Sequence, residues 1–196
     1  MLGDLSWLIV RFFGGFWSFR ERMLSQQRGN LRYRVLRAIY YVYLQRYGAF
    51  ISHSARFGGE PCFPHGIHGI FVAGNARIGR SCVIFHQVTI GANSLPDSKG
   101  AGSPVIGDRV YMGAGAKVIG AVSVGNDARI GANCAVSRDV PDNAVVVLQR
   151  PDVILRTSKP DNRYFRWSPT GPVFFDDGRW LPEKDPKVVE RLREAL

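Results

Sequence analysis

An aliphatic residue recurs at every sixth position between Val72 and Val140, and this pattern dominates the chain. The aliphatic positions are Val72, Ile78, Ile84, Ile90, Ile106, Met112, Val118, Val124, Ile130 and Val136. Glycine follows most of them, and a small or β-branched residue lies four positions later. A helix period of 3.6 or a strand period of 2 could not keep these positions in phase, whereas a parallel β-helix of hexapeptide repeats has a period of six. We therefore predict an all-β core of that kind.

The repeat begins before Val72 and is broken twice. Ile51, Phe57 and Phe63 continue the same phase, and three extra residues, Gly69 to Phe71, then shift the frame. The second break, residues 94–104, is rich in Gly, Ser and Pro, which predicts a flexible loop outside the coil. Such a loop is either a site of ligand contacts or a tolerated surface insertion, and the pattern leaves both open.

Two further segments precede the repeat. Leu2 to Phe19 is rich in Leu, Trp and Phe but is too short and too interrupted for a membrane span. It is either a helix packed on the end of the β-helix or on a neighbouring subunit, or an interfacial helix in which residues 2–22 make a peripheral membrane contact. Asn30 is expected to cap a second helix that runs to about Gly48. Its predicted inward face holds Leu31, Val35, Ile39 and Val42.

After Val140 the period is lost. We predict a short strand at 144–148 and then an irregular tail, with a hairpin as an alternative, ending in a short helix. Asp185 would cap that helix and Pro186 would begin it, with Val188, Val189 and Leu192 inward. The domains expected are thus a helical extension at 1–49, a β-helix at 50–148 with the loop at 94–104, and a tail at 149–196.

Net charge and cysteine content indicate which classes of partner and which compartment to expect. The net charge of +10 favours anionic partners, and because no nucleic-acid motif is visible, phosphate-bearing small molecules and anionic lipid rank above DNA or RNA. Cys62, Cys82 and Cys134 have no zinc-like spacing, so we interpret them as reduced core residues rather than nucleophiles. Asp4 lies where a signal peptide would be basic, and we expect a cytoplasmic protein, with the inner face of the membrane as the alternative location.

The histidines give the candidate chemistry. His65 and His86 are each third in their hexads and lie three hexads apart, so a coil of three hexads places them on one face of successive coils. Adjacent strands are roughly 4.8 Å apart, which brings the imidazoles within reach of each other or of one substrate. Ala114 and Ala132 continue the same register as a smooth groove. A neutral imidazole here would act as a general base. His68 lies in the shifted segment, and His53 belongs to a different corner.

The segments HGIHGIFV, IFHQVTIG and VYMGAGAKVIGAVSVGNDARIGANCAVSRDVPDNAVVV resemble the hexapeptide-repeat acyltransferases of the serine-acetyltransferase-like branch over about residues 50–148. The resemblance implies a left-handed parallel β-helix, a homotrimer, and acetyl transfer from acetyl-CoA bound in a cleft between subunits, with no metal. It places the catalytic histidine at His65. Acetyl-CoA contacts would fall on Gly113, Ala114, Lys117 and Ala132, and on Lys99 in the loop. We assign Pro64 and His68 to substrate binding. His86 belongs to the catalytic set, where it either orients His65 or holds the acceptor, and Glu60, Asp97 and Asp176 are further candidates for orienting His65.

The sequence also departs from that branch. The family has an Asp before the catalytic His, where this chain has Pro64, and a second Asp near the position of Phe50. The Arg-His pair that ends the loop is replaced by Gly102 and Ser103. His86 stands where those enzymes usually have Gln, and a His there is seen in relatives that acetylate sugars and glycans. These departures lead us to expect a chain closer to sugar and polysaccharide O-acetyltransferases.

The expected function is therefore O-acetylation of a saccharide or lipid-linked glycan precursor in polysaccharide biosynthesis, by direct transfer with a His general base. Serine O-acetyltransferase is the alternative within the same chemistry. From other classes, a zinc-dependent carbonic-anhydrase-like β-helix with His65, His68 and His86 as ligands, or a non-enzymatic scaffold, would also account for the repeat.

Overall fold

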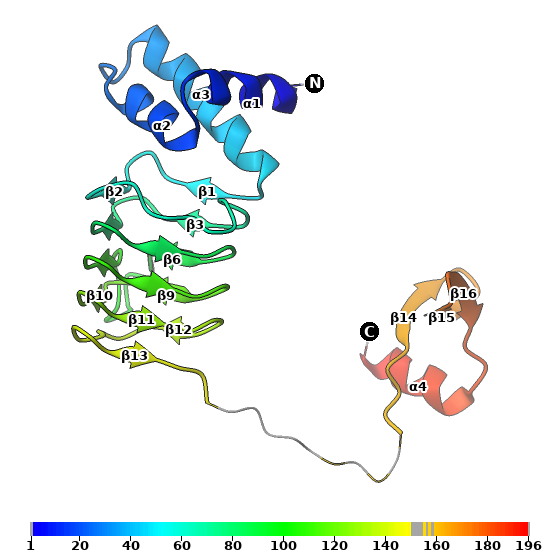
Figure 1. The fold of residues 1–196 in the computed structure, drawn as a ribbon. Coiled ribbons are helices and arrows are strands. Elements are labelled where there is room, and N and C mark those ends of the chain that lie inside the picture. The colour runs from blue at the N-terminus through cyan, green and yellow to red at the C-terminus, as the bar shows by residue number, and fades with distance from the viewer. Residues whose placement is uncertain (1, 150–154, 156, 158, 196) are drawn as a thin grey trace. The chain divides into compact units, whose positions relative to one another are not determined.

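The computed structural model describes residues 2–149, 155, 157 and 159–195. The chain divides into two compact units, Met1–Gln149 and Arg150–Leu196. In the first unit, three helices lie at one end of a left-handed parallel β-helix, as Figure 1 shows. The fold class predicted from the sixfold pattern is confirmed.

Three parallel sheets form the faces of the β-helix. The first contains β1 (Phe50–Ile51), β3 (Phe71–Val72), β6 (Thr89–Gly91), β9 (Lys117–Ile119) and β12 (Ala135–Val136), in that order. The second contains β2 (Arg56–Phe57), β4 (Arg77–Ile78), β7 (Val105–Ile106) and β10 (Ser123–Val124). The third contains β5 (Val83–Ile84), β8 (Tyr111–Met112), β11 (Arg129–Ile130) and β13 (Val145–Val146). Successive hexads therefore occupy successive faces.

The register between coils locates both breaks in the repeat. In the regular part Phe71 pairs with Thr89 and Val105 with Ser123, so one coil takes 18 residues. Phe50 pairs with Phe71 across 21 residues, and Arg77 pairs with Val105 across 28. The extra three and ten residues leave the coil between strands. They therefore change the surface without moving any aliphatic position out of the core.

The core is the inside of the β-helix. Each of the ten aliphatic positions that define the repeat exposes 4% or less of its surface, and the small residues Ala76, Cys82, Val88 and Val110 between them are fully buried. Burial raises the pKa of the Cys82 thiol, so this cysteine is a poor nucleophile. Cys134 is also buried, but Cys62 is exposed, and the prediction that all three cysteines are core residues was wrong for Cys62.

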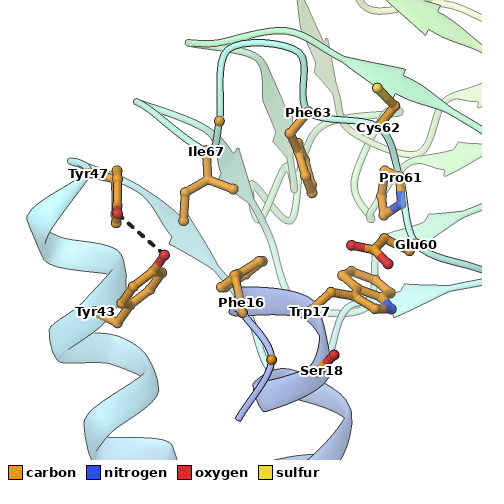
Figure 2. A pocket seen from close by; sticks show the side chains of 13 residues that line it. Phe16, Trp17, Ser18, Tyr43, Tyr47, Glu60, Pro61, Cys62, Phe63 and Ile67 are labelled. Atoms are coloured by element: carbon orange, nitrogen blue, oxygen red, sulfur yellow. Dashed lines mark hydrogen bonds between the residues drawn. The ribbon is translucent and has the colours of Figure 1, made fainter. Parts of the chain in front are cut away.

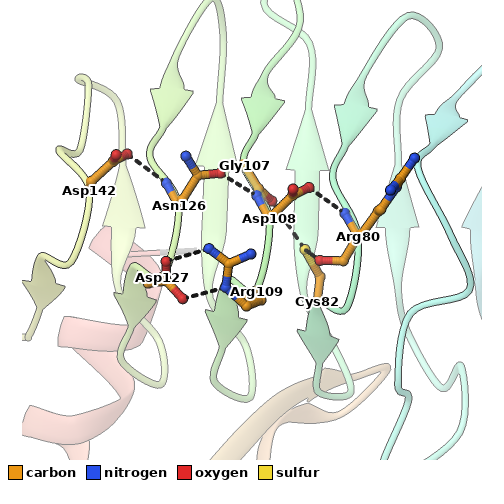
Figure 3. Close-up of polar contacts among 8 residues, drawn as sticks. All are labelled: Arg80, Cys82, Gly107, Asp108, Arg109, Asn126, Asp127 and Asp142. Carbon is orange, nitrogen blue, oxygen red and sulfur yellow. Dashed lines mark hydrogen bonds and ion pairs between the residues drawn. The ribbon is translucent and has the colours of Figure 1, made fainter.

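A ladder of side chains explains why glycine follows so many aliphatic positions. At one corner, Asp108 accepts a hydrogen bond from the Arg80 amide (2.7 Å), Asn126 from the Asp108 amide (2.8 Å), and Asp142 from the Asn126 amide (2.7 Å), as Figure 3 shows. These side chains fold over the glycine of the preceding coil. A Cβ at Gly107 would lie 2.8 Å from the Asn126 nitrogen, closer than real contacts allow. The glycine is thus required by packing between coils.

The helices α1 (Leu2–Phe12), α2 (Phe16–Leu24) and α3 (Leu31–Arg46) form what we call the helical cap. Asn30 caps α3 by accepting a hydrogen bond from the Tyr33 amide (2.7 Å), as predicted. Arg20, only 2% exposed, donates to the Ala55 carbonyl at 2.6 Å and lies over the rings of Trp17 and Phe57. A buried guanidinium therefore helps to join the cap to the first coil.

The predicted inward face of α3 was wrong for Leu31 and Val35, whereas Ile39 and Val42 are half-buried and Ile39 packs against the core. Leu31 and Val35 are exposed, whereas Tyr33, Tyr40, Tyr43 and Leu44 are buried. Aromatic rings bury more apolar surface than Leu or Val, and burial of a tyrosine costs little where its hydroxyl finds a partner. Tyr40 donates to the Ile51 carbonyl at 3.0 Å, which meets this condition at the junction with the β-helix.

The loop at residues 94–104 is fastened to the coil at several points. Asn93 and Gly102 exchange both backbone hydrogen bonds at its base, and the Ala121 amide donates to the Gly100 carbonyl at 2.9 Å. The Asn93 side chain also donates to Ser98. The expectation of a flexible loop thus underestimated how many polar groups hold it.

The second unit is more regular than the sequence pattern indicates. Strands β14 (Tyr164–Ser168), β15 (Gly171–Asp176) and β16 (Arg179–Pro182) form an antiparallel sheet, followed by α4 (Pro186–Ala195). Asp185 accepts a hydrogen bond from the Lys187 amide at 2.9 Å, as an N-cap residue does. Cross-strand aromatic contacts, such as Phe175 with Trp180 at 5.4 Å between ring centroids, hold the sheet where no sixfold period exists.

Candidate active site

His65 and His86 meet at one corner of the β-helix. Their Nδ1 atoms are 2.9 Å apart and their ring centroids 4.9 Å apart. The contact agrees with the placement counted from the hexads. The residue after each member of this register has a left-handed backbone, namely Gly66 (φ 67°), Gln87 (φ 59°), Gly115 (φ 69°) and Asn133 (φ 57°). His65, His86, Ala114 and Ala132 therefore occupy equivalent positions on four successive coils.

The neighbours of His65 fix how the ring is presented. Its edge meets the Phe85 ring at 5.1 Å between centroids and 84° between planes. Phe85 in turn contacts Tyr111 on the next coil at 5.2 Å. The His65 residue remains exposed. The aromatic wall limits rotation of the imidazole while one edge stays open to a ligand.

A hydrogen bond between two Nδ1 atoms dictates the protonation of both rings. One nitrogen must carry the hydrogen and the other must accept it. If His65 donates from Nδ1, its Nε2 is unprotonated and free to take a proton, and His86 then carries its own proton on Nε2. Among the described residues, no carboxylate makes a hydrogen bond or ion pair with either imidazole. In that tautomer His86 can orient His65, which is one of the two roles predicted for it from the sequence.

Small residues continue along this corner. Ala114 is half-buried, and Ala132 is exposed on the coil after it. Gly113 is buried, and a Cβ there would lie 2.7 Å from the Ala132 nitrogen. The absence of a side chain at Gly113 is therefore explained by packing between coils. The corner above the two histidines presents a narrow, flat strip of backbone and methyl groups.

Two lysines predicted to contact acetyl-CoA lie in different settings. Lys117 is exposed, and its ammonium group donates to the Gly115 carbonyl at 2.8 Å, beside the strip. Lys99 is exposed on the fastened loop. Both positions offer positive charge to an anionic ligand, and their roles stay predictions.

His68 and Pro64 flank this arrangement. The His68 ring meets Tyr47, just after α3, at 4.9 Å between centroids, while its backbone carbonyl accepts from the Gln87 amide. Pro64 is exposed next to His65. Among the described residues, no group of three or more His, Cys, Asp or Glu side chains could hold a metal ion. Within one chain the three histidines therefore do not converge as a set of zinc ligands, whereas the alternative considered was zinc held between subunits.

A cleft of about 700 Å³ lies between the helical cap and the first coil, beside the segment that carries His65. Figure 2 shows its lining, which includes the rings of Phe16, Trp17, Tyr43, Tyr47 and Phe63 and the carboxylate of Glu60. Burial and the Tyr47 hydroxyl raise the pKa of Tyr43, which keeps its hydroxyl protonated. Sequence analysis missed this cleft because residues from three distant segments make it.

Comparison with known proteins identifies the family. A serine acetyltransferase from Mycobacterium tuberculosis is 38% identical over 125 residues, which cover 64% of this chain and 50% of that protein. One from Bacillus licheniformis is 32% identical over 162 residues, which cover 83% of this chain and 74% of that protein. The chain belongs to the serine acetyltransferase family.

Solved structures agree with this assignment. Serine acetyltransferase isoform 3 from Entamoeba histolytica, in complex with cysteine, matches with a TM-score of 0.61 and 25% identity over 73% of this chain and 50% of that chain. No protein-family model matches the chain. The chain spans about half the length of several curated serine acetyltransferases that it matches.

These comparisons correct one prediction. The chain was expected to be closer to sugar O-acetyltransferases and to act in polysaccharide biosynthesis, but the relatives and structural neighbours are serine acetyltransferases. The reasoning failed because it took the missing Asp at Pro64 as loss of the group that orients the imidazole. The Nδ1 atom of His86 lies within hydrogen-bond distance of the Nδ1 atom of His65, where it can accept a hydrogen bond without a carboxylate.

Proposed function

We propose that this chain is an O-acetyltransferase that transfers the acetyl group of acetyl-CoA to the hydroxyl of serine. The observation that carries the proposal is the 2.9 Å contact between His65 and His86 in a member of the serine acetyltransferase family. An exposed imidazole with one nitrogen engaged and the other free is suited to general base catalysis.

In the proposed reaction His65 Nε2 removes the proton of the serine hydroxyl as that oxygen attacks the thioester carbonyl. The C–O bond forms, the C–S bond breaks, and the thiolate of CoA takes the proton back from His65. The products are O-acetylserine and CoA, and no acyl-enzyme forms. His65 becomes positively charged during attack, and its Nδ1–H then donates to neutral His86 as a charge-assisted hydrogen bond.

The strip above the histidines fits the arm of acetyl-CoA. Ala114 and Ala132 present methyl groups and backbone, which allow a narrow chain to approach closely. Lys117 lies beside this strip, and Lys99 lies on the loop, where each offers a cation to phosphate groups. The net charge of +10 adds a long-range attraction for such an anionic co-substrate.

The proposal includes a homotrimer. In a single chain the His65 residue and the strip at Ala132 are exposed, so a direct transfer that excludes water needs a second surface over this corner. A neighbouring β-helix would supply that surface.

Release of CoA thiol in the presence of acetyl-CoA tests the function. We expect release that depends on serine, and a His65→Ala variant that is slower by about 10²- to 10⁴-fold, the usual contribution of a general base. His53→Ala, at a different corner where the imidazole contacts the Tyr41 hydroxyl, is the matched control. Release that does not depend on serine, or full activity in His65→Ala, would contradict the proposal.

A further inference from the structure

The outer face of α1 carries large apolar side chains with no cover. Leu5, Leu8 and Phe12 are 54%, 56% and 84% exposed. Their spacing of three and four residues places them on one stripe of the helix. Val10, from another side of α1, is buried in the core. The helix is thus apolar on two sides, and only one of them packs against the protein.

A groove between α2 and α3 has a similar character. Leu31 and Val35 are 74% and 49% exposed. They line a groove of about 590 Å³ together with Leu36, Gln26 and the two arginines Arg22 and Arg32. Apolar side chains and guanidinium groups therefore share one small surface, where a ligand would need both an apolar and an anionic part.

The helical cap is strongly basic. Residues 1–49 hold eight arginines but only two of the 16 acidic residues of the chain, Asp4 and Glu21. Glu21 is paired with Arg20, the buried arginine. The other arginines are exposed, namely Arg11, Arg22, Arg28, Arg32, Arg34, Arg37 and Arg46. Three of them lie over aromatic rings, Arg11 over Trp7 at 5.2 Å, Arg22 over Phe13 at 4.9 Å and Arg37 over Tyr33 at 5.6 Å.

We propose that the helical cap docks on a membrane surface rich in anionic lipid. Exposed apolar side chains next to arginines match the boundary between acyl chains and negative head groups, because the apolar part enters the bilayer while the guanidinium groups meet phosphate. No described helix is long and apolar enough to cross a bilayer, so the contact is interfacial. A second copy of the cap fits this surface less well, because it would bring two sets of exposed arginines together.

Co-sedimentation of the full chain with vesicles tests the proposal. Binding is expected to vesicles that contain phosphatidylglycerol, to weaken as salt is added, and to be absent with phosphatidylcholine alone. Phe12→Ser should weaken binding by about tenfold or more through lost apolar insertion. Arg22→Gln with Arg32→Gln should weaken it by about 25-fold, since each arginine near an anionic surface contributes about fivefold.

Matched variants outside the helical cap distinguish contact of the cap with lipid from a general effect of net charge or of exposed apolar side chains. Leu148→Ser removes an apolar side chain that is 56% exposed at the far end of the β-helix, and Arg129→Gln with Arg138→Gln removes the same charge from coils distant from the cap. Both should keep most of the binding. Acetyl transfer in solution should be unchanged in Phe12→Ser, so a failure here is distinct from a failure of the proposed reaction.

Three results would overturn membrane docking. They are equal binding to neutral vesicles, equal loss in the matched variants, and full binding by Phe12→Ser. A smaller particle mass for Phe12→Ser in light scattering, without any loss of lipid binding, would instead assign the apolar stripe to contact with a second copy.

Discussion

His86 has no proton to exchange with serine in the proposed reaction, yet its removal should slow that reaction markedly. His86→Leu fills the corner with an apolar side chain but offers no acceptor for the Nδ1–H of His65. The ground state loses an ordinary hydrogen bond. The transition state loses a charge-assisted one, because His65 is then an imidazolium.

The magnitude follows from the kind of hydrogen bond that is lost. A hydrogen bond to a charged group contributes about 1.5–3 kcal/mol. The neutral hydrogen bond that the ground state loses contributes about 0.5–1.5 kcal/mol, so the barrier rises only by the difference, about 1–1.5 kcal/mol. Each 1.36 kcal/mol corresponds to tenfold in rate, so kcat should fall by roughly 5- to 13-fold. The KM for serine should change little, because the 2.9 Å contact joins the two imidazoles and does not require the substrate.

The assay is steady-state release of CoA thiol for four proteins, namely the parent chain, His86→Leu, His65→Ala and the double variant. In the double variant the loss should not exceed that of His65→Ala, because His86 acts through His65. His86→Asn offers an amide oxygen as acceptor and should recover part of the rate. Full kcat in His86→Leu, or losses that add in the double variant, would refute the orienting role.

Three further predictions concern stability, each measured by denaturant unfolding. Arg20→Met keeps the apolar stem but leaves the Ala55 carbonyl unpaired, so it should lower the free energy of unfolding by about 1–3 kcal/mol, and an unchanged midpoint would show that the guanidinium does not join the cap to the first coil. Gly107→Ala should lower the free energy of unfolding by about 1–3 kcal/mol because its Cβ would meet the Asn126 backbone. Gly100→Ala is the control, since its Cβ would lie 3.8 Å from its nearest neighbour, and it should change the free energy of unfolding by less than about 0.5 kcal/mol. Equal effects of the two variants would contradict the ladder as the cause. Burial lowers the pKa of His53 from 6.5, assisted by Arg37, Arg28 and Arg20, so the folded state binds the proton less readily than the unfolded state. The free energy of unfolding therefore takes no penalty from His53 above pH 6.5, and it decreases as the pH falls through the lowered pKa. His53→Asn should reduce this acid sensitivity relative to His68→Asn. Identical pH profiles of the two variants would contradict the assignment.

The sixfold pattern was sufficient to predict the β-helix, because the position of each aliphatic residue is set by the coil itself. The same count placed His65 beside His86, since residues in one register on adjacent coils have no freedom to separate. The sixfold period does not predict the direction of a side chain that lies outside the repeat. His68 contacts Tyr47 because α3 lies there, and the position of α3 is determined by burial of its tyrosines.

The saccharide expected as acceptor substrate was the part of the site that the sequence pattern predicted wrongly. An Asp at the position of Pro64 and a His at the position of His86 are different residues in different hexads, and nothing in a linear count shows that one can replace the other. The Nδ1 to Nδ1 distance shows that the imidazole of His86 lies within hydrogen-bond reach of His65. The proposed function depends on a contact across coils, which the spacing predicts but whose chemistry it does not describe.

The stacking order of the coils determines where local unfolding of the β-helix should begin. Each coil contacts only its neighbours, so fluctuations of the β-helix should begin at an end that lacks a neighbour. The cap covers the end near Ile51, whereas Val145 at the other end is 60% exposed. Amide hydrogens near β13 should therefore exchange with solvent early, and those beside His86 late. The paired histidines lie in the part of the chain that stays closed longest, so they keep their alignment while the distant coils fray.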